Sequence, residues 1–267
     1  MRPSRETRSL LFVPAEERRL AKVGNTNADA YIIDLEDSIS VGKKDEALAR
    51  AVAFLKEYGP HDNLFVRINK ERIRQELDAL GSYQVGIMLP KIEACSDYSN
   101  FEDALKGRPV IALVETPRAL YNAGAIASVP WIGMLAFGAE DFTAAASMRN
   151  TWDNLSVVKS LLALAAKANG KKVYDTPCFR LGDEALFDSE LKQAVDLGFD
   201  GKLAIHPGQL DKINQAFLSY DRDRMRHLVA VYESSGKAVC EIDGTVYEKM
   251  HIDRMRRMLS VADGVQE

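Results

Sequence analysis

The chain has 267 residues, of which 46% are hydrophobic and 28% are charged. This composition is that of an ordinary globular protein, and the length is enough for one large α/β barrel or two smaller domains. The formal net charge is −4, and the sequence contains no basic run or basic–aromatic stripe. These features argue against a nucleic-acid-binding protein.

The N-terminal region carries an apolar stretch, LLFVPA at residues 10–15, that runs straight into charged residues. A signal peptide has a longer apolar core, and a membrane span needs roughly 20 apolar residues, so we expect neither. The three cysteines, Cys95, Cys178 and Cys240, are widely spaced and form no CxxC pair. This pattern favours reduced thiols in a cytoplasmic protein.

Short runs typical of β-strands alternate with helical patterns from the N-terminus to about residue 210. The predicted strands lie at 9–13, 30–34, 64–68, 86–89, 110–114, 132–137, 171–175 and 202–205. Helical spacing of apolar residues is clearest at 43–59, 154–170 and 188–199, and glycines close the first two segments.

The alternation predicts the fold class. Strands that alternate with helices pair in parallel through right-handed crossovers. Eight such units favour a (β/α)8 TIM barrel over an open doubly wound sheet. We therefore predict a barrel domain over residues 1–215.

The C-terminal region exceeds what a minimal barrel needs. It contains helical patterns at 208–217, 221–238 and 251–262, and a hairpin at 241–248 with Asp243-Gly244 as its turn. We predict that residues 216–267 form an extension that packs on a neighbouring subunit.

Polar residues follow the predicted strands. In TIM barrels the working groups lie just after the carboxyl ends of the strands. In this sequence those positions hold Asp34, Glu36, Asp37, Arg67, Asn69, Lys91, Glu115, Glu140, Asp141, Asp175 and His206. Because they come from different units of the barrel, we expect them to meet at one mouth, as in an enzyme.

Glu115 and Asp141 are the predicted metal ligands. They follow neighbouring strands, and two such carboxylates without paired cysteines favour a hard cation such as Mg²⁺. A salt bridge from Glu115 to Arg118, or a role at a helix start, is the structural alternative.

Arg67 interrupts an apolar strand, which is unfavourable unless the charge is paired. It is either a clamp for a substrate carboxylate or a structural ion pair with Asp34 or Glu36. Asn69, Lys91 and, more weakly, Arg8 are further candidates for substrate binding.

Lys91 and His206 have competing interpretations. Lys91 is surrounded by acids, which favours a charged, ion-paired ammonium and argues against Schiff-base chemistry. His206 is either a base or a structural histidine. The sequence has no G-x-S-x-G elbow, P-loop or G-x-G-x-x-G.

An ordered set of motifs resembles one family. The stretches are RSLLFVPA, AYIIDLEDSI, VRIN, MLPKIE, VIALVET, AFGAEDF and GFDGKLAIHPGQ. In this order and spacing they resemble the citrate lyase β-subunit-like (CitE-like) family, which belongs to the HpcH/HpaI aldolase and malyl-CoA lyase group. The resemblance covers residues 5 to about 215.

The resemblance implies a TIM barrel that assembles as a homotrimer or hexamer. It implies Mg²⁺ on Glu115 and Asp141, a substrate carboxylate on Arg67, and Glu36 and Asp37 near the waters of the metal. The implied reaction cleaves or forms a carbon–carbon bond in citryl-, citramalyl- or malyl-type thioesters, carried by CoA or acyl carrier protein. Two alternatives stay open: a malyl-CoA-type thioesterase, and a β subunit active only within a citrate lyase complex.

One stretch departs from the family. Many of its CoA lyases carry DG-x-M-I-D near the C-terminus, whose last Asp reaches a neighbouring active site as acid or base. This chain has DGTVYEK, with Glu248 at the position of that Asp. We expect Glu248 to transfer the proton, with a lid that takes no part in the chemistry as the alternative.

Overall fold

The structure is a computed structural model that describes residues 7–59, 61, 63–218 and 222–262. The chain divides into two compact units, Met1–Asn214 and Gln215–Glu267. The division falls next to the boundary predicted between residues 215 and 216.

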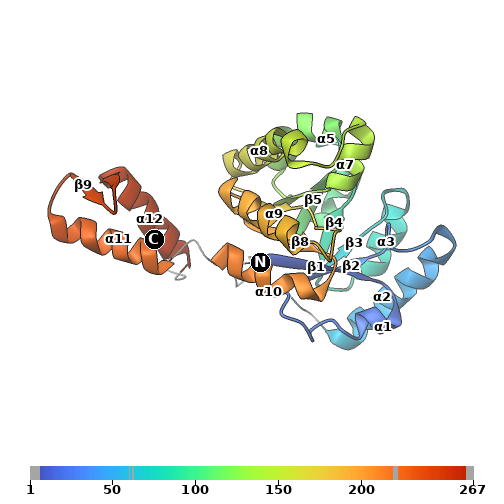
Figure 1. Cartoon of the computed structure of the whole chain (residues 1–267). Helices are drawn as coiled ribbons and strands as arrows, with labels where there is room; N and C mark the ends of the chain where they lie inside the picture. Colours follow the sequence, from blue (N-terminus) through green and yellow to red (C-terminus); the bar gives the residue numbers. More distant parts are fainter. Residues whose placement is uncertain (1–6, 60, 62, 219–221, 263–267) are drawn as a thin grey trace. The chain divides into compact units, whose positions relative to one another are not determined.

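The first unit is a closed barrel of eight parallel strands in sequential order (Figure 1). The strands are β1 (Ser9–Pro14), β2 (Ala30–Asp34), β3 (Leu64–Arg67), β4 (Gly86–Leu89), β5 (Val110–Val114), β6 (Met134–Phe137), β7 (Lys172–Asp175) and β8 (Gly201–Ala204). The ring closes because β1 pairs with both β2 and β8. The predicted TIM barrel is confirmed.

Helices and short 3-10 turns connect the strands and surround the barrel. The helices are α1 (Glu17–Leu20), α2 (Lys44–Tyr58), α3 (Ile73–Leu80), α4 (Glu102–Leu105), α5 (Pro117–Tyr121), α6 (Ala123–Ser128), α7 (Ala139–Ala146), α8 (Trp152–Ala168), α9 (Glu184–Asp196) and α10 (Leu210–Leu218). The 3-10 turns are η1 (Val41–Lys43), η2 (Lys70–Arg72), η3 (Ser99–Phe101) and η4 (Pro207–Gln209).

The strands read as continuous apolar runs because both of their faces are buried. Every residue of β2 and β5 is buried, as expected for parallel strands with a core inside and helices outside. One set of side chains fills the barrel interior, including Ile32, Phe65 and Tyr174. Gly86 gives the Phe65 ring its space, since a Cβ on Gly86 would lie 2.3 Å from that ring.

The second unit is a small helix–hairpin–helix fold. Helix α11 (Arg222–Ser235) and helix α12 (Lys249–Ala262) pack on each other. Strands β9 (Val239–Ile242) and β10 (Thr245–Glu248) lie between these helices in the sequence. They pair with each other in antiparallel orientation. Asp243 and Gly244 both have positive φ, 50° and 74°, as a tight two-residue hairpin turn requires. The predicted turn is confirmed.

None of the helices in the described part of the chain combines the length and apolar character needed to cross a bilayer.

Candidate active site

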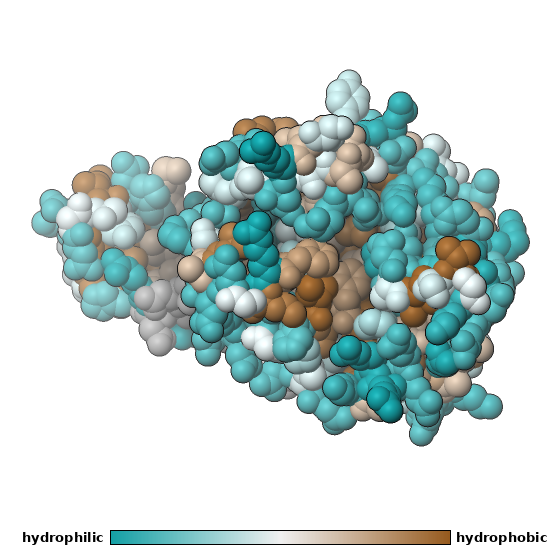
Figure 2. Space-filling model, turned by 45° about the vertical axis from the view of Figure 1, so that its right-hand side comes forward, coloured by the Kyte–Doolittle hydropathy of each residue, from teal (hydrophilic) through white to brown (hydrophobic). Residues whose placement is uncertain are grey.

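A cavity of about 480 Å³ opens at the carboxyl ends of the barrel strands. Its walls are partly apolar, and Figure 2 shows hydrophobic side chains gathered in a hollow that hydrophilic ones surround. The residues that line the cavity are Phe12, Pro14, Asp34, Asp37, Ser38, Arg67, Leu113, Glu115, Phe137, Gly138, Ala139, Glu140, Asp141, Thr176, Pro177, Phe179, Leu203 and Ile205. This is the mouth that the strand-end residues predict.

Asp34 and Arg67 form a buried bidentate ion pair. Arg67 Nε and Nη2 each lie 2.7 Å from one carboxylate oxygen of Asp34. Asp34 also accepts hydrogen bonds from the backbone N–H groups of Glu36 and Ser38. Burial acts to raise the pKa of Asp34, but the hydrogen bonds and charge of Arg67 outweigh it, and the pKa lies below its ordinary value. Asp34 is therefore ionised and serves to hold Arg67 in place.

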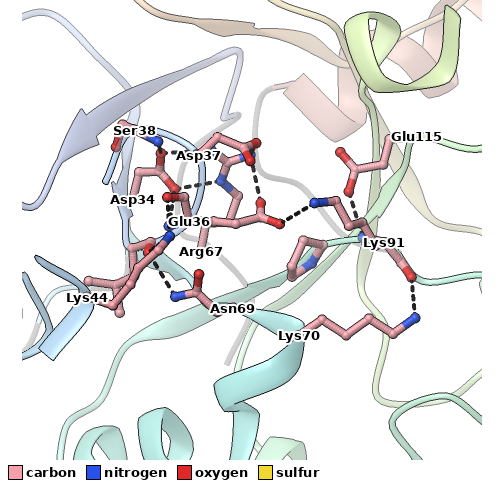
Figure 3. A network of polar contacts seen from close by, with 12 residues as sticks. Asp34, Glu36, Asp37, Ser38, Lys44, Arg67, Asn69, Lys70, Lys91 and Glu115 are labelled. Atoms are coloured by element: carbon pink, nitrogen blue, oxygen red, sulfur yellow. Dashed lines mark hydrogen bonds and ion pairs between the residues drawn. The ribbon is translucent and has the colours of Figure 1, made fainter. Parts of the chain in front are cut away.

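The third nitrogen of Arg67 faces two more acids. Its Nη1 lies 2.9 Å from Asp37 and 3.1 Å from Glu36 (Figure 3). The guanidinium also lies over the Phe12 ring, 4.9 Å from the ring centre. The structural ion pair is thus present, and Arg67 still lines the cavity, so the two interpretations of Arg67 are compatible.

Glu36 is a buried carboxylate whose two oxygens face different cations. Oε1 pairs with Lys91 Nζ at 3.1 Å. Oε2 lies 3.1 Å from Arg67 Nη1, an ion pair without a hydrogen bond, and no described residue donates a hydrogen bond to it. Burial raises the pKa of Glu36 in spite of the nearby charge on Arg67. Oε2 therefore carries an ion pair but no hydrogen bond, and it can still accept one from a water or a ligand group.

Glu115 is only 2% exposed, and its Oε1 accepts the Lys91 N–H at 2.6 Å. Burial, together with the charge of Glu36, raises the pKa of Glu115 to about 8. Gly138 makes room for it, because a Cβ there would lie 2.7 Å from Glu115 Cβ and 2.9 Å from Oε2. A carboxylate under this much negative charge is suited to a cation.

The structural alternatives for Glu115 are wrong. Thr116 caps α5 by accepting the Ala119 N–H. Within the described ranges, no ion pair joins Glu115 to Arg118. The contact of Glu115 is with the Lys91 backbone instead.

Asp141 lies in the first turn of α7, exposed and on the cavity wall. Strands β5 and β6 are neighbours, so Glu115 and Asp141 approach the cavity from adjacent units. Their proximity shows in the pKa of Glu115, which the charge of Asp141 helps to raise.

The carboxylates at the cavity fit a site for Mg²⁺. Over the residues that the structure describes, no three His, Cys, Asp or Glu side chains gather at metal-ligand spacing. Mg²⁺ does not need such a cluster, because it is commonly held by one or two carboxylates plus waters and substrate oxygens. Glu115 and Asp141 are such a pair, and Oε2 of Glu36, which pairs with Arg67 but accepts no hydrogen bond, is suited to accept from a water of the hydrated cation.

The structure corrects the placement of two predicted substrate ligands. The Asn69 amide donates to the Leu35 carbonyl and to Glu76, and does not line the cavity. Arg8 precedes β1, at the opposite end of the barrel strands, and pairs with Asp29 at 2.8 Å. Asn69 therefore supports the β2 loop, and Arg8 lies outside the site.

Lys91 and His206 both have structural roles in the described part of the chain. Burial acts to lower the pKa of Lys91, but Glu36 and its other acidic neighbours raise it, so the ammonium is charged and ion-paired as predicted. His206 Nδ1 accepts the Gly208 N–H and caps η4. Neither side chain lines the cavity.

Asp175 was expected at the barrel mouth, and the structure places it elsewhere. Its side chain is 0% exposed and pairs with Lys159 at 2.9 Å and Lys202 at 2.7 Å. Lys159 belongs to helix α8, so this carboxylate faces the helical layer and not the cavity. The next residue, Thr176, lines the cavity instead and accepts the Ala139 N–H at 3.2 Å.

Glu248 lies at the end of β10 in the second unit. Its side chain is exposed, and its backbone N–H donates to His251 Nδ1 at 3.0 Å. Its role in an active site stays a prediction.

The profile of the HpcH/HpaI aldolase/citrate lyase family matches residues 8–207. The chain belongs to this family. Within the family, a (3S)-malyl-CoA thioesterase of Cereibacter sphaeroides is 31% identical, over 97% of this chain and 95% of the relative. A citrate lyase subunit beta-like protein of Deinococcus radiodurans is also 31% identical, over 95% and 96% of the two chains.

A solved structure of the same family matches nearly the whole chain. It is the protein CitE of Mycobacterium tuberculosis in complex with magnesium, acetoacetate and coenzyme A. The TM-score is 0.82 at 26% identity, and the match covers 98% of this chain and 100% of that one. The family predicted from the motifs is confirmed.

Proposed function

We propose that the protein is a Mg²⁺-dependent carbon–carbon lyase. Its substrate would be a 3-hydroxy-acyl thioester of the citryl, citramalyl or malyl type, cleaved to a 2-oxo acid and an acyl thioester. One observation carries the proposal: the carboxylates Glu115 and Asp141 meet the guanidinium of Arg67 at one cavity. This set is suited to bind a cation, a hydroxyl and a carboxylate together.

Glu115 and Asp141 would hold the cation, as Mg²⁺ on the related CitE structure suggests. When bound, Mg²⁺ lowers the pKa of a substrate hydroxyl and stabilises the developing alkoxide. Oε2 of Glu36 would orient a water of the hydrated cation. Lys91 pairs with the other oxygen of Glu36 and so acts against the rise in its pKa that burial causes.

Arg67 would grip the carboxylate of the substrate. Its Nε and Nη2 stay on Asp34, which fixes the plane of the guanidinium. The Asp37 side chain is 54% exposed and is therefore the partner that an entering carboxylate can replace on Nη1. Because Asp34 fixes the guanidinium, a substrate carboxylate bound to Arg67 would place the substrate hydroxyl toward Glu115 and Asp141.

In the cleavage step, the hydroxyl proton would pass to water in the cavity, and the hydroxyl carbon would become the carbonyl of the 2-oxo acid. The electrons of the broken carbon–carbon bond go to the thioester as an enolate. An acid then protonates that enolate, and we assign this role to Glu248 of a neighbouring subunit. The family stretch that Glu248 replaces supports the assignment.

We place the protein in the cytoplasm as a homotrimer or hexamer. Its cysteines support a reducing compartment, since Cys95, Cys178 and Cys240 are all free thiols. The exposed Glu248 supports an assembly in which it serves another chain.

Thioester hydrolysis is the second candidate function. The relative from Cereibacter sphaeroides that bears the name malyl-CoA thioesterase favours it. A third candidate is a subunit that acts only within a citrate lyase complex on an acyl carrier protein, which the citrate lyase subunit beta-like relative favours.

The test is an assay of the isolated chain with malyl-, citramalyl- and citryl-CoA in the presence of Mg²⁺. The lyase predicts a 2-oxo acid from at least one of them, which also identifies the acyl group. Inactivity on all three CoA thioesters, with activity on the acyl-carrier forms, would favour the complex subunit.

A further inference from the structure

Lys91 has an unusual backbone conformation. It lies two residues after the end of β4 and has φ of 49°, in the left-handed region that a residue with a side chain rarely adopts. Its backbone N–H is the donor to Glu115 Oε1, at 2.6 Å. The left-handed turn at Lys91 therefore coincides with the contact that orients the proposed metal ligand.

Contacts on each side hold this conformation. The Lys91 carbonyl accepts a hydrogen bond from Lys70 Nζ at 2.8 Å, and the Lys91 ammonium pairs with Glu36 (Figure 3). Just before it, the carbonyl of Pro90 accepts from the buried Tyr98 hydroxyl. Lys70 Nζ is also 3.6 Å from Asp97. The Lys70 ammonium thus ties the β3 loop to the β4 loop.

We propose that Lys70 is a positioning residue for Glu115. By holding the Lys91 carbonyl, Lys70 fixes the backbone of Lys91 on its C-terminal side, while Tyr98 holds the Pro90–Lys91 peptide whose N–H donates to Oε1 of Glu115. Oε2 is left on the side of Gly138, which lines the cavity. The inference rests on the proposed function, in which Glu115 binds Mg²⁺.

Packing alone does not explain Lys70. Its side chain is 38% exposed, so the barrel core does not depend on it. Its partner is a backbone carbonyl beside the site, and removal of one outer group that orients a ligand typically weakens metal binding by 10- to 100-fold.

The experiment compares Lys70→Met with Lys70→Arg and Lys70→Gln. Met keeps the aliphatic stem and removes the donor, whereas Arg keeps a donor and the charge. Lys106→Met is the matched control, because Lys106 is 58% exposed and pairs with Glu102 on its own helix. Each variant is titrated with Mn²⁺, a paramagnetic stand-in for Mg²⁺, by electron paramagnetic resonance without substrate, and its thermal unfolding is recorded.

We expect Lys70→Met and Lys70→Gln to raise the Kd for Mn²⁺ about tenfold. Lys70→Arg should recover most of the affinity, and Lys106→Met should bind as wild type. Thermal unfolding should be close to wild type in all four. Unchanged Mn²⁺ affinity in Lys70→Met, or equal losses in Lys70→Met and Lys106→Met, would overturn the proposal.

Failure of the proposed function gives a different result. In that case the wild-type chain makes no 2-oxo acid from any thioester, while the Mn²⁺ titration still reports whether Lys70 acts on the site.

Discussion

At the scale of single residues, burial decides the chemistry of Glu115. Water stabilises the negative charge of an exposed glutamate. Glu115 instead is buried beside Glu36, and its pKa rises to about 8. A divalent ion relieves that unfavourable charge, which is the physical reason to expect binding.

Glu115→Gln tests this role. Gln has the same shape and can still accept the Lys91 N–H, so the fold should persist. We expect the Mg²⁺-dependent kcat to fall by roughly 10²- to 10³-fold, since a charge that binds the cation is lost. Steady-state kinetics over a Mg²⁺ range, with circular dichroism as the folding control, measures this. Near-normal kcat at ordinary Mg²⁺ concentrations would remove Glu115 from the metal site.

Asp34 makes a prediction about stability and pH. Its folded-state pKa is below its ordinary value of 3.8, so its ion pair stabilises the fold above that value. The contribution is lost as pH falls through the folded-state pKa. Asp34→Asn leaves the buried Arg67 with Glu36 and Asp37 only, and should lower the free energy of unfolding at pH 7 by about 3 kcal/mol.

Urea unfolding at pH 7 and at successively lower pH measures the difference between wild type and Asp34→Asn. The difference should shrink toward acid pH as Asp34 becomes protonated. A difference that stays constant down to pH 2 would contradict the assignment.

At the scale of the elements, the apolar runs predict all eight barrel strands to within about two residues, because parallel strands buried on both faces need continuous apolar sequence. The strand ends also predict the mouth, with Arg67, Glu115 and Asp141 at one cavity. The direction of each side chain is harder to predict. Asp175 and Thr176 are adjacent, and only contacts with the helical layer decide that Asp175 points away.

Residues that act through the backbone leave no pattern in the sequence. Lys70 and Lys44 look like ordinary surface lysines, yet they donate to the carbonyls of Lys91 and Leu35 beside the site. Gly138 acts by having no side chain. Its missing Cβ leaves the space that Glu115 occupies, and nothing in the sequence marks that space.

The β6–α7 junction gives a prediction at this scale. Gly138→Ala would bring a methyl group within 2.7 Å of Glu115 Cβ, so Glu115 or the junction must shift. We expect a loss of about 1–3 kcal/mol in the free energy of unfolding, and weaker metal binding. Gly124→Ala in α6 is the control, because a Cβ there meets nothing within 4 Å. Equal behaviour of the two variants in unfolding and Mn²⁺ titration would contradict the spatial argument.

At the scale of the whole molecule, the proposal that Glu248 serves a neighbouring chain makes a prediction. Glu115 belongs to the barrel and Glu248 to the second unit. If Glu248 serves a neighbour, two inactive variants can complement each other in one assembly.

Glu115→Gln and Glu248→Gln chains should therefore regain activity when unfolded together and refolded as a 1:1 mixture. Random assembly into a ring gives both native residues at about a quarter of the sites, so recovery should approach a quarter of wild-type kcat. Each variant refolded alone is the control. No recovery, with correct oligomers by size-exclusion chromatography, would mean that Glu248 does not act across subunits.

The central claim is that the barrel mouth breaks a carbon–carbon bond with Mg²⁺ on Glu115 and Asp141. Its most direct test is one reaction of metal-depleted protein with the thioester that the substrate panel selects, with and without added Mg²⁺. Mass spectrometry of the mixture quantifies the 2-oxo acid, the shortened acyl-CoA and free CoA. We predict equal amounts of 2-oxo acid and shortened acyl-CoA, only when Mg²⁺ is present. Free CoA with the intact hydroxy acid, or equal turnover without Mg²⁺, would contradict it.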